Sequence, residues 1–114
     1  MSEQRRTNRI APFVTPCRVT AGSRRFAAFV TDLSLLGARV TCDEESLETG
    51  VELSIEMRLP RRTTWQRLEG KVVWVRVGER GAATFGVSFA PLDATDREVV
   101  EQALGEFRRL AESF

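Results

Sequence analysis

Residues 51–59 read Val-Glu-Leu-Ser-Ile-Glu-Met-Arg-Leu, and their pattern decides the class of fold. Apolar and polar side chains alternate strictly along this stretch. A period of two places the apolar residues on one face of a β-strand and the polar residues on the other. Strands with one buried and one solvated face are typical of antiparallel sheets, so this stretch predicts a mainly β protein.

Five further segments on either side of this strand are rich in β-formers and are bounded by turn residues. They lie at residues 13–20, 26–31, 38–42, 65–77 and 85–89, and a hairpin across Ala21–Arg25 fits the first two. Such short, closely spaced strands predict a six-stranded antiparallel β-barrel, whose closure removes exposed strand edges. In the fourth segment, plain alternation predicts one face with Val73, Val75 and Val77 and another with Val72, Trp74 and Arg76.

The end of the chain has a different period. From Val100 to Phe114 the apolar residues fall at helical spacing, and Asp93 or Thr95 is placed to cap the start of the helix. The apolar stripe of this helix either packs on the barrel or pairs with a second subunit in a homodimer. We expect a flexible polar arm at residues 1–11, followed by a single domain at residues 12–114 that contains the barrel and the C-terminal α-helix.

Composition narrows the function. The chain has 114 residues and a formal net charge of +1, which argues against a general binder of nucleic acid or membrane surfaces. It has no histidine, and Cys17 and Cys42 lack CxxC spacing. We therefore expect no metal site, no catalytic residues and no cofactor, because Zn²⁺ sites and nucleophile–base pairs depend on such groups. The chain is predicted not to be an enzyme.

The same composition bears on location. No segment approaches the roughly 20 apolar residues that span a bilayer, and the first residues do not resemble a signal peptide. We expect a cytoplasmic protein without membrane insertion, whose two cysteines are reduced and buried.

Two short motifs carry the chemistry. The first is Arg5-Arg6-Thr7-Asn8-Arg9 in the predicted arm, and the second is Asp32-Leu33-Ser34-Leu35-Leu36-Gly37 at the end of a predicted strand. The second also has a purely structural interpretation. Its Asp and Ser side chains can hydrogen-bond backbone amides and set a turn. Its glycine can adopt positive φ or permit the close approach of a ligand or another strand.

Together the two motifs resemble the signature of the PilZ family, which is RxxxR followed by [D/N]xSxxG. Residues 72–74 and 85–89 also resemble the last two barrel strands of that family. The resemblance implies a six-stranded barrel from bacteria that binds the second messenger cyclic di-GMP. By the same resemblance, the contacts to this nucleotide come from Arg5, Arg6, Arg9, Asp32, Ser34 and Gly37.

The chemistry of these side chains suits cyclic di-GMP. An arginine fork matches both a phosphate and the O6 and N7 acceptors of guanine. The N–H edge of guanine suits a carboxylate such as Asp32. Leu36 departs from the family pattern, in which a small residue often precedes the motif glycine, and it either alters the rim of the site or packs inward. Gly86 aligns with a glycine that lies near the ligand in some family members, but we expect close packing or a bulge there. Trp74 could stack on a base, but we expect an apolar barrel position for it.

These assignments predict a receptor whose arm folds onto the barrel when nucleotide binds, so that a protein partner reads the changed surface. The identity of that partner is open. The main alternative is a PilZ-like interaction adaptor that does not bind nucleotide. An oligonucleotide-binding barrel is disfavoured by the near-neutral charge, so neither DNA nor RNA is expected as a partner.

Overall fold

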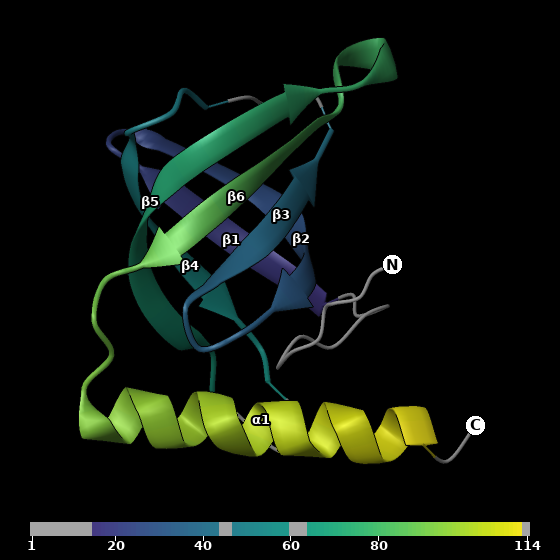
Figure 1. The fold of residues 1–114 in the computed structure, drawn as a ribbon. Helices are drawn as coiled ribbons and strands as arrows, with labels where there is room; N and C mark the ends of the chain where they lie inside the picture. The colour runs from purple at the N-terminus through teal and green to yellow at the C-terminus, as the bar shows by residue number, and fades with distance from the viewer. Residues whose placement is uncertain (1–14, 44–46, 60–63, 113–114) are drawn as a thin grey trace.

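The computed structural model describes residues 15–43, 47–59 and 64–112 of the chain. In chain order the elements are β1 (Thr15–Ala21), β2 (Arg24–Leu33), β3 (Gly37–Cys42), β4 (Glu52–Met57), β5 (Gln66–Val77), the 3-10 turn η2 (Glu79–Gly81), β6 (Ala83–Phe89) and α1 (Ala94–Glu112). The six strands close into an antiparallel barrel in the order β1-β2-β3-β6-β5-β4 (Figure 1). The predicted fold class is confirmed.

Regular alternation builds the wall formed by β1 and β4. Along β1, Cys17, Val19 and Ala21 are buried, whereas the residues between them are exposed or half-buried. In β4, Ile55 and Met57 are both 0% exposed. Burial of side chains of this size contributes about 1.5–3 kcal/mol each. The period of two therefore identified the core face of β4 correctly.

A register shift interrupts β2 where it pairs with β3. The pairing passes from Val30 to Asp32 between consecutive residues of β3, so Thr31 is the extra residue of a β-bulge. Val30 and Leu33 are 0% and 1% exposed and belong to the core. The two residues between them therefore share the outer side of the sheet, because a bulge changes which residues face inward.

A second register shift interrupts β5 where it pairs with β6, and here the predicted faces were wrong. Val72 is 1% exposed and Val75 packs against the core, whereas Val73 and Trp74 are 47% and 39% exposed. The pairing passes from Val72 to Trp74, which leaves Val73 as the extra residue. Trp74 is therefore not an apolar interior residue but lies on the outside of the barrel.

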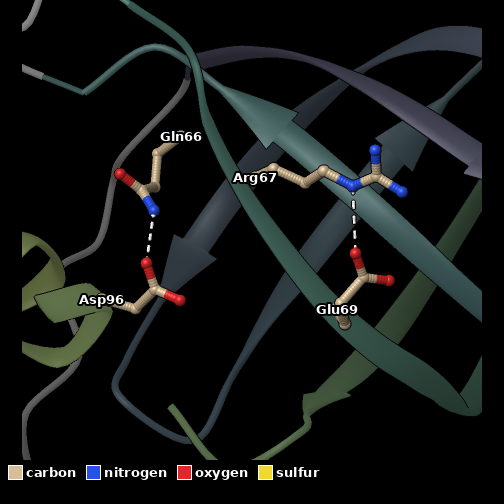
Figure 2. Close-up of polar contacts among 4 residues, drawn as sticks. All are labelled: Gln66, Arg67, Glu69 and Asp96. Carbon is tan, nitrogen blue, oxygen red and sulfur yellow. Dashed lines mark hydrogen bonds and ion pairs between the residues drawn. The ribbon is translucent and has the colours of Figure 1, made fainter. Parts of the chain in front are cut away.

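Helix α1 lies across one end of the barrel (Figure 1). The buried residues of its apolar stripe, which join the core, are Val99, Val100, Ala103 and Leu104. The Asp93 carboxylate caps its first turn, because it accepts a hydrogen bond of 2.7 Å from the backbone N–H of Asp96. The Asp96 carboxylate in turn accepts a hydrogen bond of 2.8 Å from Gln66 of β5 (Figure 2). The described part of the stripe is buried within the chain itself and so supplies no reason for predicting a homodimer.

The core contains both cysteines. Cys17 and Cys42 are buried, as predicted. Burial raises the pKa of the Cys17 thiol to about 12, and the nearby Cys42 adds to this increase. Such a thiol is inert at neutral pH.

The described residues form no group of three or more Cys, Asp or Glu side chains arranged to hold a metal ion. None of their helices combines the length and the apolar character needed to cross a membrane.

Candidate functional site

The turn between β2 and β3 is held by Ser34. Its hydroxyl oxygen accepts hydrogen bonds from the backbone N–H groups of Leu36 and Gly37, at 3.2 and 3.3 Å. The backbone N–H of Ser34 donates to the carbonyl oxygen of Gly37 at 2.9 Å, which closes the turn. These contacts are those of a serine that sets a local turn. The predicted structural role of Ser34 is therefore confirmed, and its contact with a ligand stays a prediction.

Gly37 allows β6 to approach closely. A Cβ added at this position would collide with the backbone carbonyl of Val87. Only glycine leaves this space, and its φ angle is not among the positive ones in the described chain. Of the two predicted reasons for glycine here, close approach of another strand is the one that applies. The neighbouring Leu36 is 82% exposed, so it lies on the rim and does not pack inward.

The bulge in β2 places Asp32 opposite Arg39 on the outer side of the sheet. The two residues are direct partners in the β2–β3 ladder. Opposite charges in such pairs stabilise a sheet by about 0.2–1 kcal/mol. Asp32 is only 5% exposed, although it lies on the outer side. Burial of a carboxylate is costly unless donors or cations compensate it, so Asp32 marks a position that is suited to positive groups.

Thr31, the extra residue of that bulge, fixes the side chain of Arg39. The Arg39 Nε atom donates a hydrogen bond of 3.1 Å to the Thr31 hydroxyl, which itself lies 3.4 Å from the Arg39 carbonyl oxygen. A guanidinium held at Nε keeps its two Nη atoms as a fork of donors. That fork is the part of arginine that contacts phosphate or guanine through two parallel hydrogen bonds.

The bulge in β5 places Trp74 against Gly86. The two residues are partners in the β5–β6 ladder, and a Cβ added at Gly86 would collide with the Trp74 indole. The predicted close packing at Gly86 is therefore confirmed. Gly86 also pairs with Arg39 in the β3–β6 ladder. Four adjacent strands thus contribute one continuous outer row: Asp32, Arg39, Gly86 and Trp74.

A cavity of about 430 Å³ opens over three members of this row, Arg39, Gly86 and Trp74. Its lining includes Ser34 and Gly37 from the turn, Arg39 from β3, and Trp74 and Gly86 from the β5–β6 pair. Its volume falls within the range of small-molecule sites. The lining offers a hydroxyl, a guanidinium and a partly exposed indole, a combination that suits an anionic aromatic ligand.

The predicted site is brought together in part. Ser34 and Gly37 line the cavity, whereas Asp32 belongs to the outer row but not to the lining. Arg5, Arg6 and Arg9 lie outside the described residues. Sequence reasoning missed Arg39 altogether and placed Trp74 on the wrong face. The one distinguishing feature of Arg39 in the sequence is its place two residues after the motif glycine, at the start of β3.

Comparison with known proteins agrees with this architecture. The model of the PilZ domain family matches residues 3–106. The chain matches no curated protein sequence. Among solved structures, the PilZ domain of YcgR from Escherichia coli with c-di-GMP is similar with a TM-score of 0.77 at 14% identity, covering 97% of this chain and 96% of that one.

Two other solved structures are similar. The PilZ domain of CeSA from a cellulose-synthesizing bacterium has a TM-score of 0.65 at 21% identity, covering 90% of this chain and 99% of that one. MotI, an inhibitor of motility from Bacillus subtilis, has a TM-score of 0.73 at 17% identity, and the match covers 96% of this chain. The chain spans about half of MotI, 53% of its length. At these identities the likenesses show the fold alone.

Proposed function

The chain belongs to the PilZ domain family, and from that premise we propose that it is a receptor for cyclic di-GMP that changes its surface on binding and so regulates a protein partner. The observation that carries the proposal is the cavity at the β2–β3 turn. It joins the second half of the motif to an arginine fork and an indole on the outer face of the barrel. A binding role of this kind requires no catalytic group.

We assign the two halves of the motif different tasks. Arg5, Arg6 and Arg9 supply guanidinium groups to the phosphates and the guanine O6 and N7 acceptors. Asp32 serves the N–H edge of a guanine, or it anchors one of those arginines at the rim. In the second case, the positively charged arm is drawn towards a buried carboxylate.

The turn itself gives shape to the site. The Ser34 hydroxyl already accepts hydrogen bonds from two backbone N–H groups, so its contribution is chiefly to hold Leu36 and Gly37 in place. Gly37 lets β3 and β6 lie close together beside the cavity, because a side chain there would meet the Val87 carbonyl. We add Arg39 as a fork for phosphate or guanine and Trp74 as a surface on which a guanine stacks.

Calorimetric titration with cyclic di-GMP tests this assignment. Replacement of Arg9 by alanine removes a charged contact that contributes about 1.5–3 kcal/mol. We therefore expect the affinity of Arg9→Ala to fall roughly ten- to a hundredfold. Arg58→Ala is the matched control, because it removes an exposed arginine at the end of β4, outside the cavity. Equal affinities of the wild type and Arg9→Ala would contradict the role of the arm.

A thermal-shift measurement separates the receptor from an adaptor that does not bind nucleotide. A ligand that binds only the folded state raises the melting temperature. At a ligand concentration of a hundred times the Kd, it adds about 2.7 kcal/mol to the free energy of unfolding. An unchanged melting temperature at saturating cyclic di-GMP would favour the adaptor.

A further inference from the structure

The outer face of the β1–β2 hairpin contains a second cavity. Residues of the two strands face one another there as the pairs Pro16 with Phe29, Arg18 with Ala27, and Thr20 with Arg25. Ala27 is small and stands between larger neighbours, so the surface is hollowed above it. The resulting groove has a volume of about 500 Å³. It shares no lining residue with the cavity at the β2–β3 turn.

Two exposed aromatic side chains line this groove. Phe29 is 48% exposed and Trp65 is 41% exposed. They come from distant parts of the chain, β2 and the segment just before β5. Aromatic side chains that are presented in this way supply a large contact area at low conformational cost, which is typical of protein interfaces.

The Trp65 ring is held in position before any partner arrives. The Arg18 guanidinium lies over it, 5.1 Å from the ring centroid. The same guanidinium forms an ion pair of 3.3 Å with Glu56 of β4. Since the ion pair with Glu56 orients Arg18, and Arg18 lies over the ring, less freedom is lost when the groove is filled.

Most charged residues of the β1–β2 hairpin are basic, although Arg18 is already paired with Glu56 of β4. The hairpin, residues 15–33, contains Arg18, Arg24 and Arg25 and a single acid, Asp32. That acid is 5% exposed and belongs to the other site. Arg18 and Arg25 both line the groove. A complementary partner therefore carries negative charge on either side of an apolar group.

We propose that this groove is the docking site for an acidic peptide segment of a partner protein, with one aromatic or aliphatic side chain seated over Ala27 between Phe29 and Trp65. Carboxylates that flank this anchor reach Arg25 and Arg18. The proposal does not depend on nucleotide binding, because the groove and the cavity at the turn are built from different residues.

Charge also distinguishes a protein partner from a nucleic acid. Beyond Arg18 the outer positions alternate in sign, with Glu56 on β4 paired to Arg67 on β5, which lies 3.0 Å from Glu69 (Figure 2). A single strand of nucleic acid needs a continuous positive track for its phosphates. The short positive stretch that is flanked by acids suits a few carboxylates instead.

Fluorescence anisotropy of labelled synthetic peptides tests the proposal, with full-length protein and no nucleotide. The probe is a short peptide with a central phenylalanine flanked on both sides by glutamates. The matched peptides have alanine in place of phenylalanine, or lysines in place of the glutamates. We expect both replacements to weaken binding at least about tenfold. No binding of the acidic probe, equal binding of the lysine peptide, or tighter binding of oligothymidylate would overturn the proposal.

Variants locate the binding surface. Arg25→Glu reverses an exposed charge, and Phe29→Ser removes an exposed ring. Each is expected to lower the affinity for the acidic probe about tenfold or more. Val77→Ser is the control, because Val77 is 65% exposed and lies outside both cavities. Unchanged binding by Arg25→Glu would overturn the assignment even if Phe29→Ser failed to fold. A separate titration with cyclic di-GMP reports on the proposed function, so the two proposals fail independently.

Discussion

Two regions on the outside of the same barrel are built from similar parts in different ways. The cavity at the β2–β3 turn and the groove on the β1–β2 hairpin each contain a tryptophan under an arginine, Trp74 with Arg76 and Trp65 with Arg18. Register shifts on two strands shape the turn cavity, whereas the hairpin pairs without a break from Thr15 to Ala21.

The difference shows how a β-barrel concentrates polar chemistry on its surface. A regular strand offers only every second residue to the outside, so the hairpin groove depends on the small size of Ala27. A bulge places neighbouring residues on the same side, as it does for Thr31 and Asp32 and for Val73 and Trp74. The irregular region can therefore gather more functional groups in less area.

The largest expected effect is on the irregular region, the cavity at the β2–β3 turn. In Gly37→Ala the new Cβ meets the backbone carbonyl of Val87, which cannot rotate away. We expect a loss of about 3 kcal/mol in the free energy of unfolding, at the upper end of the range for overpacking. Denaturant titration measures this loss. Gly105→Ala is the control, because nothing lies near its Cβ and alanine favours the helix by up to about 1 kcal/mol. A loss below 1 kcal/mol in Gly37→Ala would show that β3 and β6 separate easily.

A second expected effect concerns the regular hairpin, whose strand β1 contains the buried Cys17. The pKa of this thiol is raised from 9.0 to about 12, so the folded state favours the protonated form. Its contribution to stability is complete below pH 9.0 and is lost as the pH rises towards 12. At one pH unit above 9.0, the free energy of unfolding has fallen by about 1.4 kcal/mol.

Denaturant titrations across this alkaline range measure the loss. Cys17→Val should remove most of the slope, whereas Lys71→Arg, which replaces the only lysine in a chain without tyrosine, should keep it. An equal slope in wild type and Cys17→Val would mean that water reaches the thiol beneath the hairpin.

The smallest expected effect is also in the turn cavity, at the contact between Gly86 and Trp74. In Gly86→Ala the new Cβ meets the Trp74 indole, at its Nε1 and Cε2 atoms first. An indole that is 39% exposed can turn away, so we expect a cost of only about 1 kcal/mol. The fluorescence of Trp74 should shift to longer wavelength, and affinity for cyclic di-GMP should fall. Fluorescence is best compared in a Trp65→Phe background. An unchanged spectrum would show that Trp74 does not rest on Gly86.

Local sequence patterns were enough for the elements and for part of the site. The alternation at residues 51–59, the helical spacing after Asp93 and the turn chemistry of Ser34 all act over a few residues, and the structure confirms them. The contacts assigned to Arg5, Arg6 and Arg9 stay predictions. Arg39 escaped notice because a single arginine on a strand is not distinctive until its neighbours are known.

The sequence by itself determined a six-stranded barrel with a C-terminal helix, because the period of its apolar residues specifies which faces must leave water. Only the tertiary structure decided where the ladder slips, at Thr31 and Val73, and hence which polar groups share the outer row. The physical reason is that a bulge depends on how two strands fit each other around a closed sheet. That fit is a property of the paired strands, β2 with β3 and β5 with β6, and neither strand encodes it alone.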